Sequence, residues 1–191
     1  DEPTGRRIEI GWWRTNTAKD EAAFNQSMSL PLEHKLIKTT EGIRLTRMPV
    51  KEVENLRSGK AYKPGNKTIK ENGTNPLKDI SIELAELRME ITPGKAKEII
   101  LNVRGVAVIY NVADQQLVVD GVKAPAPLQQ GKLSLLVYAD RTGLEIFANN
   151  GLMFMPVNIN IDDSNRSLSL SAKGSAAKVS GLEVHELKSI W

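Results

Sequence analysis

The chain has 191 residues, of which 40% are apolar and 26% are charged, the composition of a globular protein with room for one domain and an appended segment. Its net charge of +3 comes from scattered lysines and arginines, so the sequence marks no nucleic-acid-binding surface. No apolar stretch approaches the roughly 20 residues of a membrane span, and the absence of cysteine excludes disulfides and thiolate zinc sites.

The N-terminal part predicts short strands. Ile8, Ile10 and Trp12 alternate with polar residues or glycine, which is the period of a half-buried strand. A second apolar series covers residues 28–36. Within it, Pro31 has to lie at an edge or at a strand start because it has no N–H to donate.

The next segment predicts one more strand and then a connection. Residues 42–50 alternate after a turn, and residues 52–57 have room for one helical turn. Residues 58–76 are poor in large apolar side chains and rich in lysine, glycine and asparagine. We expect them to form a connection or an exposed hairpin.

From residue 80 onward the strand pattern is dense, and apolar runs recur at roughly 8–12 residue intervals. Asp120-Gly121 and Asn150-Gly151 are typical hairpin turns, and Gly105 interrupts the apolar run of residues 99–110. Only residues 85–90 compete as a helix. We therefore predict an all-β fold, an antiparallel β-sandwich of the concanavalin-like or jelly-roll type.

The catalytic and cofactor motifs of common enzymes are absent from this sequence. His34 and His185 are far apart and lack the spacing of a metal site, so we expect both to be exposed strand residues. We expect no metal and no cofactor.

The group Asp140, Arg141 and Glu145 is the most suggestive polar cluster. In one interpretation Asp140 caps a turn and Arg141 forms an ion pair that ties the hairpin to its neighbour. In the other, the arginine and the carboxylates hold sugar hydroxyls. Exposed aromatic rings also serve sugar binding, and Tyr138 and Trp12 are candidates for that role, whereas Trp191 is expected to anchor the last strand.

Several segments, taken in order, resemble the C-terminal part of glycoside hydrolase family 32, the levanases, inulinases and invertases. They are Gly-Arg-Arg-Ile-Glu-Ile-Gly-Trp-Trp at 5–13, Met-Ser-Leu-Pro at 28–31, Arg-Leu-Thr-Arg-Met-Pro-Val at 44–50, Leu-Arg at 56–57, Tyr-Ala-Asp-Arg-Thr-Gly-Leu-Glu-Ile-Phe at 138–147 and the closing strand at 182–191. Trp13 and Leu32 depart from the family pattern, which commonly has methionine and arginine there.

The resemblance implies a β-propeller that holds the active site, followed by a β-sandwich. Residues 1–30 would be a remnant of the last propeller blade, 31–76 connecting strands and a linker, and 77–191 the sandwich. None of the family's catalytic carboxylate motifs is present in the sequence, so no catalytic residue is carried over. Trp12 matches a family tryptophan that approaches the fructosyl pocket.

The resemblance therefore implies a non-catalytic module that supports the catalytic propeller of a parent fructan-type or sucrose-type hydrolase, its expected partner, and that binds fructan or fructose. The alternatives are a purely structural or interaction domain without a ligand, and one part of a split β-fructosidase. An extracellular or periplasmic location follows from the family alone. An unpaired apolar strand at residues 8–12 would fold back on the sandwich or pair with a second copy as a homodimer.

Overall fold

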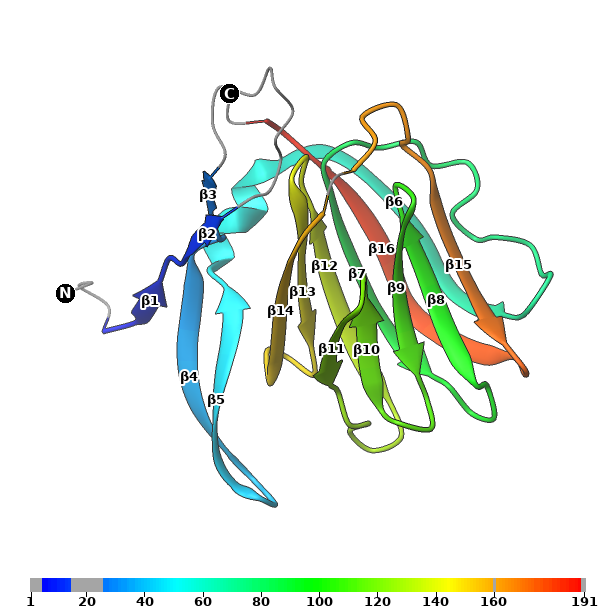
Figure 1. Cartoon of the computed structure of the whole chain (residues 1–191), viewed down its shortest axis with the longest axis horizontal. Helices are drawn as coiled ribbons and strands as arrows, with labels where there is room; N and C mark the ends of the chain where they lie inside the picture. The colour runs from blue at the N-terminus through cyan, green and yellow to red at the C-terminus, as the bar shows by residue number, and fades with distance from the viewer. Residues whose placement is uncertain (1–4, 15–25, 160, 190–191) are drawn as a thin grey trace.

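The described elements of this chain are almost all β-strands. The computed structural model describes residues 5–14, 26–159 and 161–189 (Figure 1). No helix within these ranges is long and apolar enough to cross a membrane. The elements are β1 Arg7–Glu9, β2 Trp12–Arg14, β3 Gln26–Met28, β4 Leu32–Thr39, β5 Gly42–Pro49, the 3₁₀ helix η1 Lys51–Leu56, β6 Arg57–Ile69, β7 Ala85–Thr92, β8 Glu98–Val103, β9 Val106–Asn111, β10 Gln116–Val119, β11 Val122–Pro125, β12 Leu133–Ala139, β13 Gly143–Ala148, β14 Met153–Asn158, β15 Leu168–Lys173 and β16 Ala177–Leu187.

Two antiparallel sheets form the sandwich. One has six strands in the order β14-β13-β12-β7-β16-β6, and the other has five in the order β11-β10-β9-β8-β15 (Figure 1). Inward side chains such as Leu87, Val137 and Leu101 are at most 1% exposed and build the core between the sheets. Each such side chain contributes about 1.5–3 kcal/mol by burial. The predicted all-β sandwich is confirmed.

The hairpin turns lie where the dipeptides predict them. Asp120 and Gly121 have φ values of 47° and 77° and join β10 to β11. Arg104 and Gly105 have φ values of 54° and 89°, so the apolar run from residue 99 becomes the two strands β8 and β9. Residues 149–152 join β13 to β14, with Asn150 and Gly151 both at positive φ.

The prediction for residues 58–76 is wrong. The expected connection at residues 58–76 is largely strand β6, which pairs with β16 at the edge of the six-stranded sheet. An edge strand with three register irregularities needs few apolar side chains, and only its Tyr62 and Ile69 join the core. Residues 85–90 belong to strand β7, and the alternation of residues 80–84 produces only an isolated bridge at Ser81.

A third sheet, β1-β4-β5, stands beside the sandwich and is called the N-terminal sheet below (Figure 1). Strand β1 pairs with β4, and β2 pairs with β3, so the apolar N-terminal strand has partners in its own chain. The expectation that this strand is half-buried is wrong. Ile8, Ile10 and Trp12 are 41%, 53% and 63% exposed, because β1 and β2 lie at the side of these small sheets and no described element covers them.

A second, smaller core joins the N-terminal sheet to the outer face of the six-stranded sheet, the face turned away from the five-stranded sheet. It contains the buried residues Leu32, Val50, Val53, Leu136, Tyr138 and Phe147. The main-chain N–H of Arg47 in β5 also donates to the carbonyl of Gly151, at 2.9 Å. This contact is close, because a Cβ on Gly151 would collide with the Arg47 carbonyl.

The division into blade remnant, linker and sandwich stays a prediction, although β6 lies within the sandwich and before residue 77. The predicted anchoring role of Trp191 lies outside the described residues.

Candidate functional site

The turn between β12 and β13 carries the two polar residues that the sequence singles out. The main-chain N–H of Asp140 donates to the carbonyl of Gly143 at 3.0 Å, which closes the turn. The carboxylate of Asp140 accepts the N–H of Arg141 at 2.7 Å. Asp140 therefore caps this turn, as the first interpretation of the sequence expects.

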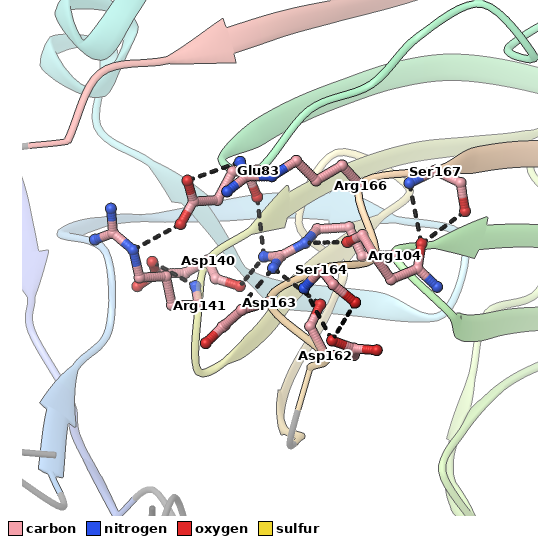
Figure 2. Close-up of polar contacts among 10 residues, drawn as sticks. Glu83, Arg104, Asp140, Arg141, Asp162, Asp163, Ser164, Arg166 and Ser167 are labelled. Carbon is pink, nitrogen blue, oxygen red and sulfur yellow. Dashed lines mark hydrogen bonds and ion pairs between the residues drawn. The ribbon is translucent and has the colours of Figure 1, made fainter. Parts of the chain in front are cut away.

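Glu83 holds two arginine side chains at the surface (Figure 2). Arg141 Nε donates to one carboxylate oxygen and an Arg166 terminal nitrogen donates to the other, both at 2.8 Å. These hydrogen bonds, that of Arg166 foremost, hold the pKa of Glu83 below its ordinary value. Both arginines stay about half exposed, so their remaining N–H groups face water.

A buried arginine organises the loops beneath this surface. The Arg104 side chain is fully buried and donates to the main-chain carbonyls of Asn165, Glu83, Asp140 and Asp162 at 2.9–3.4 Å (Figure 2). Burial lowers its pKa. Because one guanidinium group joins loops that lie far apart in sequence, the positions of Glu83 and Asp140 depend on it. Glu83, Arg104, Asp140, Arg141 and Arg166 are called the arginine cluster below.

The loop that carries Arg166 is held by its own side chains. Asp162 accepts hydrogen bonds from the N–H and the hydroxyl of Ser164, and Asn165 accepts the same pair from Ser167, at 2.7–3.0 Å (Figure 2). Such local side-chain turns fix a loop without regular structure. No group of three or more possible metal ligands occurs within the described residues.

Tyr138 and Glu145 lie elsewhere, on the outer face of the six-stranded sheet. They are directly opposite each other on β12 and β13, and they are 5% and 7% exposed. Tyr138 packs edge-on against Phe147 at 6.3 Å between ring centres, and burial raises its pKa. The expected sugar-binding group is thus divided: Asp140 and Arg141 share a surface, whereas Tyr138 and Glu145 are covered.

Glu145 is a buried acid at the junction with the N-terminal segment. One carboxylate oxygen accepts the main-chain N–H of Leu30 at 2.9 Å, and the other has no hydrogen-bond partner among the described residues. Burial raises the pKa of Glu145 to about 7. The hydrogen bond from Leu30 opposes this shift and the nearby charge of Asp140 adds to it.

The two neighbouring tryptophans differ in environment. The Trp12 ring is exposed, and its indole N–H donates to the side chain of Gln26 at 3.0 Å. Trp13 packs against the turn at Gly143, where an added Cβ would lie 2.7 Å from the ring. Trp12 is therefore available at the surface, whereas Trp13 helps to fix the N-terminal segment to the sandwich.

Sequence reasoning missed a buried ion network on β6 and β7. Arg57 binds both oxygens of Glu86 at 2.8 and 2.9 Å, and Arg88 also donates to Glu86 and reaches Glu54 of η1 at 3.1 Å. Burial opposes the ionisation of Glu86, but the two arginines outweigh it and keep its pKa below the ordinary value. The only sequence signal is the placement of charged residues on the outward positions of β7.

The histidines do not come together. His34 on β4 lies beside Glu9, and His185 on β16 lies 3.2 Å from Glu183. Their side chains are 22% and 11% exposed, so the prediction that both are exposed strand residues is wrong, because each lies under a neighbouring carboxylate on its sheet.

Comparison with known proteins identifies relatives of the whole chain. Residues 52–186 match the family model described as glycosyl hydrolases family 32 C terminal. A levanase of Bacillus subtilis strain 168 is 32% identical, and the alignment covers 97% of this chain and 31% of the levanase. A levanase of Bacillus sp. strain L7 is 28% identical over 100% of this chain and 24% of its own length. The chain thus spans less than a third of these curated relatives.

Solved structures share the fold. Exo-inulinase from Aspergillus awamori superposes with a TM-score of 0.75 at 16% identity, over 96% of this chain and 41% of the inulinase. Fructan 1-exohydrolase IIa from Cichorium intybus superposes with a TM-score of 0.73 at 15% identity, over 98% of this chain and 46% of the hydrolase.

Proposed function

Because this chain belongs to the glycosyl hydrolases family 32 C-terminal family, we propose that it is a non-catalytic module that supports the catalytic domain of a fructan-hydrolysing enzyme. Its curated relatives are levanases of more than three times the aligned length, which supports a parent enzyme of that class. The 191 residues lack the catalytic motifs of the family, which supports the non-catalytic role.

The observation that carries this proposal is an N-terminal sheet that is attached to the sandwich at one end of the β4–β5 hairpin and exposes apolar side chains toward the other end. The second core and the Arg47–Gly151 hydrogen bond fix one part of it to the sandwich. On the hairpin of β4 and β5, Leu36, Ile43 and Leu45 share one face by register and are 73%, 69% and 37% exposed.

A second exposed apolar pair lies nearby in sequence. Trp12 and Met28 are directly opposite each other on β2 and β3 and are 63% and 58% exposed. Exposed apolar patches of this kind commonly mark protein interfaces. We propose that the catalytic domain covers both groups.

Co-expression tests this function. The chain is produced with the catalytic part of the Bacillus subtilis levanase, from which the matching region has been removed. We expect the two to co-elute in size-exclusion chromatography, and levan hydrolysis only when the catalytic part is present. The double variant L36D/I43D should abolish co-elution.

The matched control is V122D, since Val122 is also an exposed strand residue, 48% exposed, but lies on β11 of the sandwich. Equal effects of V122D and L36D/I43D would contradict docking through the N-terminal sheet. Release of fructose by the chain alone would contradict the non-catalytic role. A self-associating chain that ignores the catalytic part would favour the homodimer instead.

A second candidate function, fructan binding, is favoured by the exposed arginine cluster. Two guanidinium groups held by Glu83 present rigid donors to water, and such donors suit sugar hydroxyls. Calorimetric titration with levan, inulin and fructose tests it, with R141A as the variant. Unchanged affinity in R141A would exclude the cluster, and absence of any binding would favour the ligand-free structural domain.

A further inference from the structure

The outer face of the six-stranded sheet carries a groove of about 370 Å³ beside the second core. Strands β7, β12, β13 and β16 contribute its floor, and Met48 of β5 and Asn150 of the β13–β14 turn also line it. Its volume lies near the lower end of the range for small-molecule sites. The groove is separate from the arginine cluster, with which it shares no lining residue.

A polar row crosses this groove from strand to strand. Glu90 on β7 is directly opposite Ser134 on β12 and Ser180 on β16, so the three side chains point to the same face. Lys132 and Ser180 both donate to one carboxylate oxygen of Glu90, at 2.8 and 3.2 Å. Its other oxygen accepts no hydrogen bond from any described residue, and Lys132 keeps the pKa of Glu90 below its ordinary value.

Arg88 and Asn150 also line the groove, and the other lining residues are apolar or glycine. Leu136 and Phe147 form the apolar part of the floor, and Met48 stands against them. At Gly181, where β16 has a register irregularity and φ is 60°, an added Cβ would meet nothing within 4 Å. The groove therefore presents a row of carboxylate and hydroxyl groups beside the partly exposed side chain of Met48, which packs on the buried Leu136 and Phe147.

This arrangement selects the chemical class of the ligand. An extended peptide adds to a sheet edge, but β7, β12 and β16 are all paired on both sides. An anion would meet the carboxylate of Glu90, and Arg88, which also lines the groove, is already bound to Glu86 and Glu54. A neutral polyhydroxyl chain donates hydrogen bonds to a carboxylate and places its C–H face on apolar side chains.

We propose that this groove binds a short segment of a fructan chain, with the free oxygen of Glu90 as the principal acceptor. The ligand class rests on the fructan-hydrolysing function proposed above. Ser134 and Ser180 flank the acceptor, and the partly exposed Met48 contacts the apolar side of the sugar.

Titration of the 191-residue chain with levan oligosaccharides and inulin oligosaccharides tests the groove, with maltoheptaose as a non-fructan control. We expect E90Q to bind the preferred fructan about tenfold more weakly, because a charged acceptor is lost. S180A should weaken binding less. The matched control is E98Q, since Glu98 also pairs with a lysine, Lys173 at 3.0 Å, but lies on the five-stranded sheet.

The outcomes separate the groove from the module function. The proposed groove site would be overturned if no fructan binds saturably or if E90Q and wild type bind with equal affinity. It would also be overturned if only R141A loses binding. None of these results would affect co-elution with a catalytic domain, which tests the supporting role independently. Heteronuclear NMR shifts confined to the groove residues would confirm its location.

Discussion

Glu145 accepts the main-chain N–H of Leu30 at 2.9 Å, across 115 positions of sequence. This hydrogen bond crosses from the sandwich to the segment that leads into the N-terminal sheet. Its acceptor is a buried carboxyl whose second oxygen has no hydrogen-bond partner in the described part of the chain, so the ionised form is poorly solvated.

The junction at Glu145 should make stability depend on pH. The pKa of Glu145 rises from 4.5 to about 7 on folding, so the folded state holds this proton more tightly. The stability that protonated Glu145 contributes to the folded state is complete below pH 4.5 and is lost as the pH rises through 7. We expect the free energy of unfolding to fall by an amount on the order of 1–3 kcal/mol over this pH range.

The variant E145Q mimics the protonated acid and should remove this part of the pH dependence. Urea unfolding at pH 5 and pH 8 measures it, and E145Q should be more stable than wild type at pH 8 only. E145A leaves the Leu30 N–H unpaired and should cost about 1–3 kcal/mol at pH 5. Its cost should be smaller at pH 8, where the wild type has lost the stability contributed by the protonated Glu145. Parallel pH profiles of wild type and E145Q would contradict the assignment.

Glu86 should show the opposite dependence. Its pKa is lowered, so the stability that it contributes is present above pH 4.5 and lost as the pH falls. E86Q should cost about 2–3 kcal/mol at pH 7, less than for a fully buried pair because Arg57 and Arg88 keep part of their surface in water. The cost should shrink in acid.

The control for Glu86 is E183Q on β16. Glu183 pairs with Lys63 at 3.2 Å at the surface, so its replacement should cost less than about 1 kcal/mol. Equal unfolding free energies for E86Q and E183Q would show that the buried network stabilises the fold no more than a surface ion pair does.

Gly151 should be required for attachment of the N-terminal sheet. G151A places a Cβ against the Arg47 carbonyl and should loosen β5, with faster proteolytic cleavage within residues 32–49. G131A is the matched control, because Gly131 also has positive φ, 78°, but an added Cβ would meet nothing within 4 Å. Both variants carry backbone strain, so the difference in their cleavage rates and thermal midpoints isolates the collision.

Arg104 should set the shape of the arginine cluster. R104K keeps the charge but loses the planar fork that serves four carbonyls, and we expect a loss of about 2–4 kcal/mol in unfolding free energy. R166K alters an exposed arginine of the same cluster and should cost less than about 1 kcal/mol. Similar losses in the two variants would contradict the organising role of Arg104.

The sequence predicts the sandwich well because its signals are local. Alternation along β12 and β13 and the turn pairs at Asp120 and Asn150 are properties of a few consecutive residues. Strand β6 was not predicted because its side chains do not show the alternation of a strand. It is a strand because its backbone pairs with β16.

The candidate site was predictable only in part. Asp140 and Arg141 are neighbours in sequence, so their shared turn could be inferred. Glu83 is 58 positions away from Arg141 in the sequence, and Arg166 is 83 positions away from Glu83. Only the folded loops bring these three residues together. Period-two alternation also leaves open which face is the core, so it could not show that Tyr138 and Glu145 lie beneath the N-terminal segment.

Met48 belongs to two neighbourhoods at once: it packs against the second core and it lines the groove. A protein bound to the N-terminal sheet and a sugar bound in the groove would therefore both affect the side chain of Met48. Thermodynamic linkage then makes their effects mutual: if the catalytic domain tightens sugar binding by some factor, the sugar tightens domain association by the same factor. In an intact enzyme, Met48 would link the affinity of the groove for sugar to the affinity between the two domains.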